Sequence, residues 1–220
     1  MQLNLAGIID MSTIDWYGHG STVIFLRGCP LHCPNCINDE YRAGESMVDM
    51  AEISARLVRA VPFTGHIVLS GGEPLAQPEA CTEIIRRAHS LGLQIGVETS
   101  GCLPLVDGFD FIMVSLKTSL RRGPYSRQGW TDQQYDTLLS NLNRLHPKRS
   151  EIRLVLFRDS DYDFSTLKPI RGIPIRIQLG VEPKPLSTTA LNMFAVNLAK
   201  SLKYSIVSYT DKMYSLKPKR

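Results

Sequence analysis

The chain has 220 residues, 43% of them hydrophobic and 21% charged, which is the composition of an ordinary globular domain. Lys and Arg (25) outnumber Asp and Glu (21) only slightly, which argues against a dedicated nucleic-acid-binding protein. The sequence lacks the ~18-residue apolar run of a membrane span, and its first residues lack the basic stretch of a secretory signal. We therefore expect a cytoplasmic protein with no membrane partner and no direct contact with nucleic acid.

In the first half of the chain, apolar β-branched segments alternate with amphipathic ones, as in strand-helix units around a parallel sheet. The first strand is predicted over 22–26. A helix follows, with Asp49 as its N-cap and Glu52 three residues later. The second strand is predicted over 66–70. A second helix begins near Pro78, and the third strand covers 94–98.

The same alternation continues in the second half. The segment 99–110 leaves room for only a short or irregular helix before the fourth strand at 111–115. A helix from Thr131, with Gln134 as its capping-box partner, precedes the fifth strand at 152–157. The sixth strand, 173–179, places Arg176 and Gln178 on one face, and in a barrel this face would line the lumen. Gln178 is therefore a candidate cofactor-binding residue.

No repeat, low-complexity tract or Gly/Ser linker divides the sequence, which predicts a single α/β domain over 1–220. Its core is expected at about 18–180. The remaining 187–220 would hold a helix at about 187–202, an extra strand and a basic tail.

The cysteines point to a metal or redox site. There are five, an odd number, and Cys29, Cys33 and Cys36 form a C-x3-C-x2-C loop directly after the first strand, so a disulfide framework is disfavoured. The loop is compatible with a zinc site completed by His32 or a distant cysteine, with plain surface thiols, or with a four-iron cluster that keeps one open coordination position.

With its flanking residues, this loop resembles that of the radical S-adenosylmethionine (SAM) enzymes, which carry C-x3-C-x2-C after the first strand of a partial TIM-type barrel. Phe25-x-x-Gly28-Cys29 is similar to the glycyl-radical-enzyme activases, and Cys33-Pro34-x-Cys36-x-Asn38 to the activases of anaerobic ribonucleotide reductase. The resemblance implies an open barrel of about six parallel strands, with Cys29, Cys33 and Cys36 as ligands of a 4Fe-4S cluster.

Polar motifs also follow the next two predicted strands. Gly71-Gly72-Glu73 reads either as a tight turn with a helix-capping Glu or as a ligand site, and the resemblance implies that it binds the amino group of SAM. Glu98 ends the third strand as a solvated acid or, by resemblance, as the residue that binds the ribose of SAM. TIM-like barrels build their active sites at these strand ends, which agrees with the resemblance.

The fourth strand ends in Ser115-Leu116-Lys117, where activases usually have Asp-x-Lys. Ser115 is therefore a candidate cofactor-binding residue, although a monovalent-cation site of the pyruvate formate-lyase activase type is in doubt without the aspartate. Lys117 is a candidate for the SAM carboxylate or the backbone of a partner. Arg153, on the fifth strand, is a second candidate catalytic cation. Both cations also have an ordinary surface ion-pair interpretation.

The resemblance implies an anaerobic oxidoreductase that reductively cleaves SAM to a 5'-deoxyadenosyl radical. As an activase, the chain would use this radical to take a hydrogen atom from a glycine of a larger glycyl radical enzyme, anaerobic ribonucleotide reductase being the expected partner. Electrons would come from a flavodoxin- or ferredoxin-type donor. The activases with a ferredoxin-like insert are excluded, because they need eight further cysteines.

Two alternatives remain at this point. Glu98-Thr99-Ser100-Gly101 and Ser115-x-Lys117 are also similar to 7-carboxy-7-deazaguanine synthase, a radical SAM enzyme that acts on a small molecule. That family follows its third cysteine with Asp-Thr, the threonine serving a magnesium ion, whereas this chain has Ile37-Asn38. The other alternative is a zinc-binding interaction module.

Overall fold

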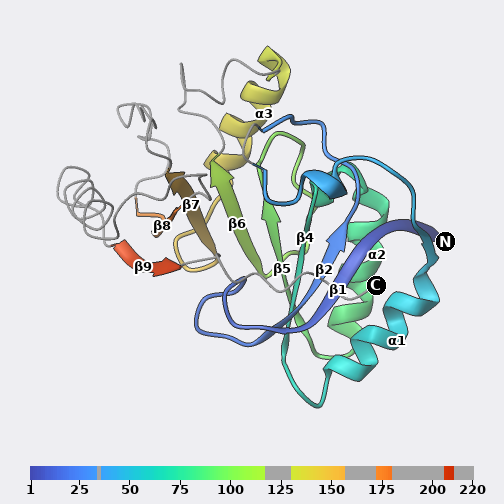
Figure 1. The fold of residues 1–220 in the computed structure, drawn as a ribbon. Coiled ribbons are helices and arrows are strands. Elements are labelled where there is room, and N and C mark those ends of the chain that lie inside the picture. Colours follow the sequence, from blue (N-terminus) through green and yellow to red (C-terminus); the bar gives the residue numbers. More distant parts are fainter. Residues whose placement is uncertain (34–35, 117–129, 157–171, 180–205, 211–220) are drawn as a thin grey trace.

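The computed structural model describes residues 1–33, 36–116, 130–156, 172–179 and 206–210 (Figure 1). Within these residues the chain forms one nine-stranded sheet in the order β3-β1-β2-β4-β5-β6-β7-β8-β9. Its strands are β1 (Gln2–Ser12), β2 (Ser21–Leu26), β3 (Met47–Asp49), β4 (His66–Gly71), β5 (Gln94–Thr99), β6 (Phe111–Leu116), β7 (Ser150–Leu156), β8 (Ile175–Leu179) and β9 (Ile206–Thr210). The helices are α1 (Met50–Ala60), α2 (Pro78–Ser90) and α3 (Asp132–Asn143), with 3-10 turns η1 (Asp39–Tyr41) and η2 (Pro74–Ala76).

The sheet is parallel from β2 to β9, and only its first edge is antiparallel. Each strand from β4 onward pairs in parallel with its predecessor in the sheet. β1 pairs antiparallel with β2, and β3 with β1. The two edge strands, β3 and β9, do not pair with each other, so the barrel stays open. The predicted α/β fold with an open, mostly parallel barrel is confirmed.

Most of the predicted elements form. The six predicted strands correspond to β2, β4, β5, β6, β7 and β8, with ends that differ by up to two residues, and the first three predicted helices are α1, α2 and α3. The extra strand expected in 187–220 is β9, whereas the helix predicted at about 187–202 lies outside the described residues. The expectation of a helix in 99–110 is wrong: after β5 this connection consists of turns and bends.

β1 is a strand that the sequence reading missed. Its register against β2 shifts between Leu5 and Gly7 and again between Ile9 and Ser12. Each irregularity interrupts the strict alternation of inward and outward residues by which a strand is read from sequence. β3, at three residues, is too short to show a pattern at all.

Helices cover the outer face of the sheet. α1 and α2 pack on the β1 to β5 side through a cluster that includes Ile24, Ile53, Leu69 and Ile84, and Figure 1 shows the two helices together on that side. α3 packs on β6 to β8 through Leu138 and its neighbours. No helix in the described part of the chain is long and apolar enough to cross a membrane.

The inner face is closed at its amino-terminal end by the loop between β1 and β2. Trp16 is buried there; its ring stacks on Phe111 with centroids 5.2 Å apart and meets His66 edge-on at 4.8 Å. His66 and Phe111 begin β4 and β6. The amino-terminal end of the barrel lumen is thus closed. The polar motifs lie at the opposite end, at the carboxyl ends of the strands.

Candidate functional site at the carboxyl ends of the strands

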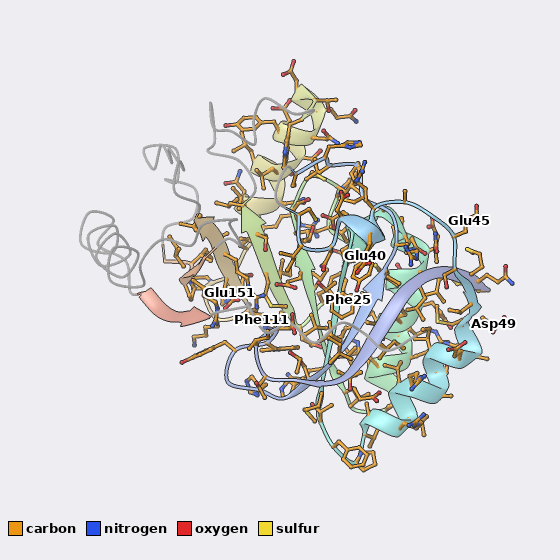
Figure 2. The ribbon with its side chains drawn as sticks, in the orientation of Figure 1. Phe25, Glu40, Glu45, Asp49, Phe111 and Glu151 are labelled. Carbon is orange, nitrogen blue, oxygen red and sulfur yellow. The ribbon has the colours of Figure 1, made fainter. Side chains whose placement is uncertain are left out.

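The cysteine loop is fixed to the protein at both of its ends. Where β2 stops, the amide of Gly28 donates to the carbonyl of Tyr41 at 2.9 Å, and the amide of Cys29 to that of Arg42 at 3.3 Å. The Arg27 guanidinium donates to the carbonyl of Glu40 at 2.8 Å and to that of Ala43. Figure 2 shows Glu40, in η1, above the carboxyl ends of the central strands.

The thiols of this loop suit an iron-sulfur cluster. Cys29 and Cys33 are half-buried and Cys36 is exposed. Burial raises the pKa of Cys29 to about 11, and the charges of Glu73, Cys33 and Cys36 contribute to the rise, so Cys33 and Cys36 each lie within electrostatic reach of Cys29. Thiolates are the ligands that such clusters use. Within the described residues, no three His, Cys, Asp or Glu side chains are arranged so that they could hold a metal ion.

The other potential ligands are engaged elsewhere. The Nδ1 atom of His32 lies 2.6 Å from the Arg42 guanidinium, which disfavours His32 as the fourth ligand of a zinc ion. Cys81 is fully buried on α2 and its thiol donates to the carbonyl of Pro74 at 3.2 Å. Cys102 is buried as well; it hydrogen-bonds the Ser100 side chain and lies within electrostatic reach of Cys29. The loop therefore supplies three thiols rather than four.

Gly71 and Gly72 bring the end of β4 into backbone contact with the cysteine loop. The amide of Gly72 donates to the carbonyl of Leu26 at 2.9 Å, and the amide of Glu73 to that of Gly28 at 2.7 Å. Gly71 has φ +126°, and a Cβ atom on it would overlap the backbone of Leu26; one on Gly72 would overlap the carbonyl of Gly28. Only glycine permits this approach, so the predicted turn and the thiols form one unit.

The carboxylate of Glu73 faces the protein. Its side chain caps η2 by accepting from the amide of Leu75 at 3.2 Å, and it also accepts from the hydroxyl of Thr99 at 2.7 Å and from the amide and hydroxyl of Ser100. The residue is only 1% exposed. The helix-capping interpretation is therefore right for the side chain, and what the turn can offer to a ligand is its main chain.

Glu98 lies nearer the opening, at the end of β5. Its side chain is 10% exposed, so it is not the solvated acid of the alternative interpretation. One oxygen, Oε2, accepts from the hydroxyl of Ser70 at 2.8 Å, and the other accepts from Nη1 of Arg153. A carboxylate has about four acceptor positions, and these two bonds fill two of them.

Arg153 is a buried centre of charge rather than a surface residue. Its Nε donates to Glu151 at 2.7 Å and its Nη2 to the carbonyl of Asp15 at 2.5 Å. Burial alone would lower the pKa of Arg153, but the charges of Glu98 and Glu151 outweigh it and raise the pKa. Glu151 in turn pairs with Arg176 at 2.6 Å.

The remaining predicted residues occupy the same region to different extents. Ser115 ends β6 almost fully buried, at the same level as Arg153 across the strand pair. Lys117 lies outside the described residues. Gln178 lies on β8, level with Val155, but its side chain is not described.

Two features of the charged cluster were not predicted. One is the presence of Glu151 in it, and the other is the ion pair between Glu151 and Arg176. The signal was present: Glu151 and Arg153 are two apart and so share a face of one strand, the same face of the sheet that carries Arg176.

Known proteins resemble this chain in sequence and in fold. The sequence profile of the radical SAM superfamily matches residues 23–165. A Methanocaldococcus jannaschii protein named as a candidate glycyl-radical enzyme activating enzyme is 37% identical over 110 residues, which cover 48% of this chain and 44% of that protein. The chain thus spans less than half the length of this relative.

Two further matches cover more of the chain. The 7-carboxy-7-deazaguanine synthase of a Synechocystis species is 25% identical over 177 residues, 78% of this chain and 74% of the synthase. The crystal structure of QueE from Escherichia coli superposes with a TM-score of 0.64 and 17% identity, over 96% of this chain and 94% of QueE. At this identity the second match shows the fold alone.

Proposed function

The chain belongs to the radical SAM superfamily, and we propose that within it the protein is an activase that installs a glycyl radical on a partner enzyme, anaerobic ribonucleotide reductase being the expected partner. A glycyl-radical activase name recurs among its relatives, including the pyruvate formate-lyase-activating enzyme of Clostridium pasteurianum, 33% identical over 86 residues. These 86 residues cover 36% of each chain, so the shared segment is a core and the partner is a proposal.

The observation that carries the proposal is the position of Asn38, two residues after the third cysteine. Its side-chain amide donates to the carbonyl of Gly71 at 3.1 Å, which ties the cysteine loop to the Gly-Gly turn. The resemblance places asparagine here in the activases of anaerobic ribonucleotide reductase. In the deazaguanine synthases the same position is a threonine that serves magnesium, and here an amide already engaged with backbone stands in its place.

In this proposal the residues of the site divide the work of holding the cofactors. Cys29, Cys33 and Cys36 hold the cluster, and the main chain of Gly71 and Gly72 faces the amino group of SAM. When bound, the 4Fe-4S cluster would supply one electron for the reductive cleavage of SAM, and this chemistry would remove one hydrogen atom from the partner's glycine.

The other residues orient SAM in the barrel opening. Glu98 accepts from the ribose hydroxyls, while Ser115, Lys117 and Gln178 contribute polar groups around the ligand from β6, the segment after it and β8. Trp16 fills the amino-terminal end of the lumen, so the fold excludes water from that end. A flavodoxin- or ferredoxin-type protein is the proposed electron donor.

A second candidate is a small-molecule enzyme of the 7-carboxy-7-deazaguanine synthase type. The observation in its favour is coverage, since the match to the Synechocystis enzyme extends over three quarters of both proteins.

One experiment separates the two candidates. The protein is reconstituted anaerobically with iron and sulfide, reduced, and mixed with SAM and anaerobic ribonucleotide reductase whose glycines carry deuterium at the α carbon. We expect a glycyl radical signal and deuterium in the 5'-deoxyadenosine. Formation of 7-carboxy-7-deazaguanine from the substrate of an authentic synthase, with no glycyl radical, would overturn the activase proposal in favour of the second candidate.

A further inference from the structure

We propose that Arg153 is a positioning residue that fixes the carboxylate of Glu98 for the ribose hydroxyls of SAM and does not itself touch the ligand. This inference rests on the part of the proposed function that assigns Glu98 to the ribose. It gives Arg153 a different role from that of a cation facing the SAM carboxylate or a partner's backbone.

The first argument is that every nitrogen of the Arg153 guanidinium already has a protein partner, and that the side chain is buried. Nη1 bonds Glu98, Nε bonds Glu151 at 2.7 Å, and Nη2 bonds the carbonyl of Asp15 at 2.5 Å and the sulfur of Met113 at 3.0 Å. The side chain is 1% exposed. Because the guanidinium is planar, partners at all three nitrogens also fix its orientation.

The second argument is that Glu98 lies between this fixed group and the opening of the barrel. The Ser70 hydroxyl on β4 holds one carboxylate oxygen at 2.8 Å, and Arg153 on β7 holds the other. With one oxygen anchored from the adjacent strand β4 and the other from β7, two strands away on the other side of β5, the plane of the carboxylate is set. Bidentate acceptance from two adjacent hydroxyls requires such a set plane, because both acceptor positions must face the ligand together.

The third argument is charge balance. Glu98 and Glu151 carry two negative charges, and Arg153 and Arg176 carry two positive charges. The guanidinium carbon of Arg176 lies 4.2 Å from the centre of the Tyr17 ring. Arg176, the last residue in the series Glu98, Arg153, Glu151 and Arg176, is therefore also held in place. Glu151 therefore bonds Arg153 through Nε and leaves Nη1 to Glu98, and the two cations offset the charges of these two acids. Asp15 is a third buried acid within electrostatic reach of Arg153.

The test measures SAM affinity rather than turnover. Reconstituted wild type and Arg153→Met are titrated with SAM and with an analogue that lacks both ribose hydroxyls. We expect the variant to bind SAM about tenfold or more weakly and to bind the analogue as well as wild type does. Equal losses for both ligands would overturn the proposal, as would unchanged affinity for SAM.

Arg153→Met removes one cation and leaves both Glu98 and Glu151, so a second variant keeps the test decisive if the single variant does not fold. Arg153→Met/Glu151→Gln removes one cation and one acid together and so leaves the net charge of the cluster unchanged, and we expect the same selective loss for SAM. Arg153→Lys keeps the positive charge but not the planar guanidinium, and we expect its SAM affinity to lie between those of Arg153→Met and wild type. Arg144→Met, which removes a surface ion pair with Asp107, is the matched control and should change neither affinity.

Coupling to Glu98 gives an independent readout. If Arg153 acts through Glu98, then Glu98→Gln/Arg153→Met weakens SAM binding no more than Glu98→Gln alone. Additive losses would overturn the proposal. Wild type that binds SAM and cleaves it but forms no glycyl radical would refute the activase assignment while leaving these binding results to decide the role of Arg153.

Discussion

The carboxylate of Glu73 accepts hydrogen bonds from both the amide and the hydroxyl of Ser100, at 2.8 and 2.5 Å. The two residues follow neighbouring parallel strands, β4 and β5, so this contact joins the ends of those strands at the edge where the cysteine loop lies. An acid that appears in the sequence as a ligand residue thus serves to hold two loops together.

We predict that Glu73→Gln destabilises the protein by about 1–3 kcal/mol, because the new amide group faces the backbone amides of Leu75 and Ser100, which can only donate. The measurement is the thermal unfolding midpoint of the reconstituted protein. Glu45→Gln, at an exposed loop position, is the control and should leave the midpoint unchanged. A midpoint equally unaffected in both variants would mean that the buried hydrogen bonds of Glu73 contribute nothing net.

Gly71→Ala should destabilise the protein by much more than an alanine in a left-handed backbone conformation usually does. The residue has φ +126° and its new Cβ would overlap the Leu26 backbone at the start of the cysteine loop. Gly92 is the control, because it also has a positive φ, +73°, but nothing lies within 4 Å of its Cβ position. Gly92→Ala should cost about 1–2 kcal/mol.

Iron content and unfolding midpoint distinguish the two glycine variants. We expect Gly71→Ala to lose iron after reconstitution as well as stability, since the turn and the thiol loop share backbone hydrogen bonds, whereas Gly92→Ala keeps its iron. Similar behaviour of the two variants would show that close approach to Leu26 is not what requires glycine.

Local patterns predicted the strands and the thiol loop well, for a physical reason. Strands buried on both faces are continuous apolar runs that stand out without neighbours, as β4 (HIVLSG) does, and three cysteines within eight residues need no fold to be recognised. β1 could not be found in this way, because its irregular register against β2 removes the period of two.

The roles of single charged residues were harder to predict, because they depend on pairing between strands. The register that sets Arg153 opposite Arg176 brings Glu151 close to both guanidinium groups. Nothing in the sequence of β7 alone shows that Arg153 is buried and fully paired rather than facing a ligand. Likewise, the four donors around Glu73 come from two separate loops.

Cys36→Ala should abolish cluster assembly, because the loop supplies only three thiols and Cys36 is the exposed one. The measurement is bound iron, about four per chain in wild type, together with 5'-deoxyadenosine formed from SAM. Cys81→Ala is the matched control. It removes a buried thiol of α2 and should lower stability while keeping the iron. A Cys36→Ala protein that still held four irons would remove Cys36 from the ligand set.

The histidine pair at the plugged end of the barrel gives a prediction about pH. The rings of His19 and His66 lie 4.1 Å apart, and the pKa of His66 is lowered, first by burial and then by the charge of His19. A histidine with a lowered pKa binds fewer protons folded than unfolded, so its contribution to stability is present above the unfolded value of about 6.5 and is lost as the pH falls below it.

We therefore predict that His19→Gln raises the pKa of His66 toward its ordinary value without reaching it, because burial beside Trp16 remains. The loss of stability between about pH 6.5 and the lowered pKa should become shallower in this variant. Titration of the His66 ring by NMR measures the shift directly, and His146→Gln, at an exposed position, is the control. If the His66 titration curve does not move, the charge of His19 does not contribute to the lowered pKa of His66.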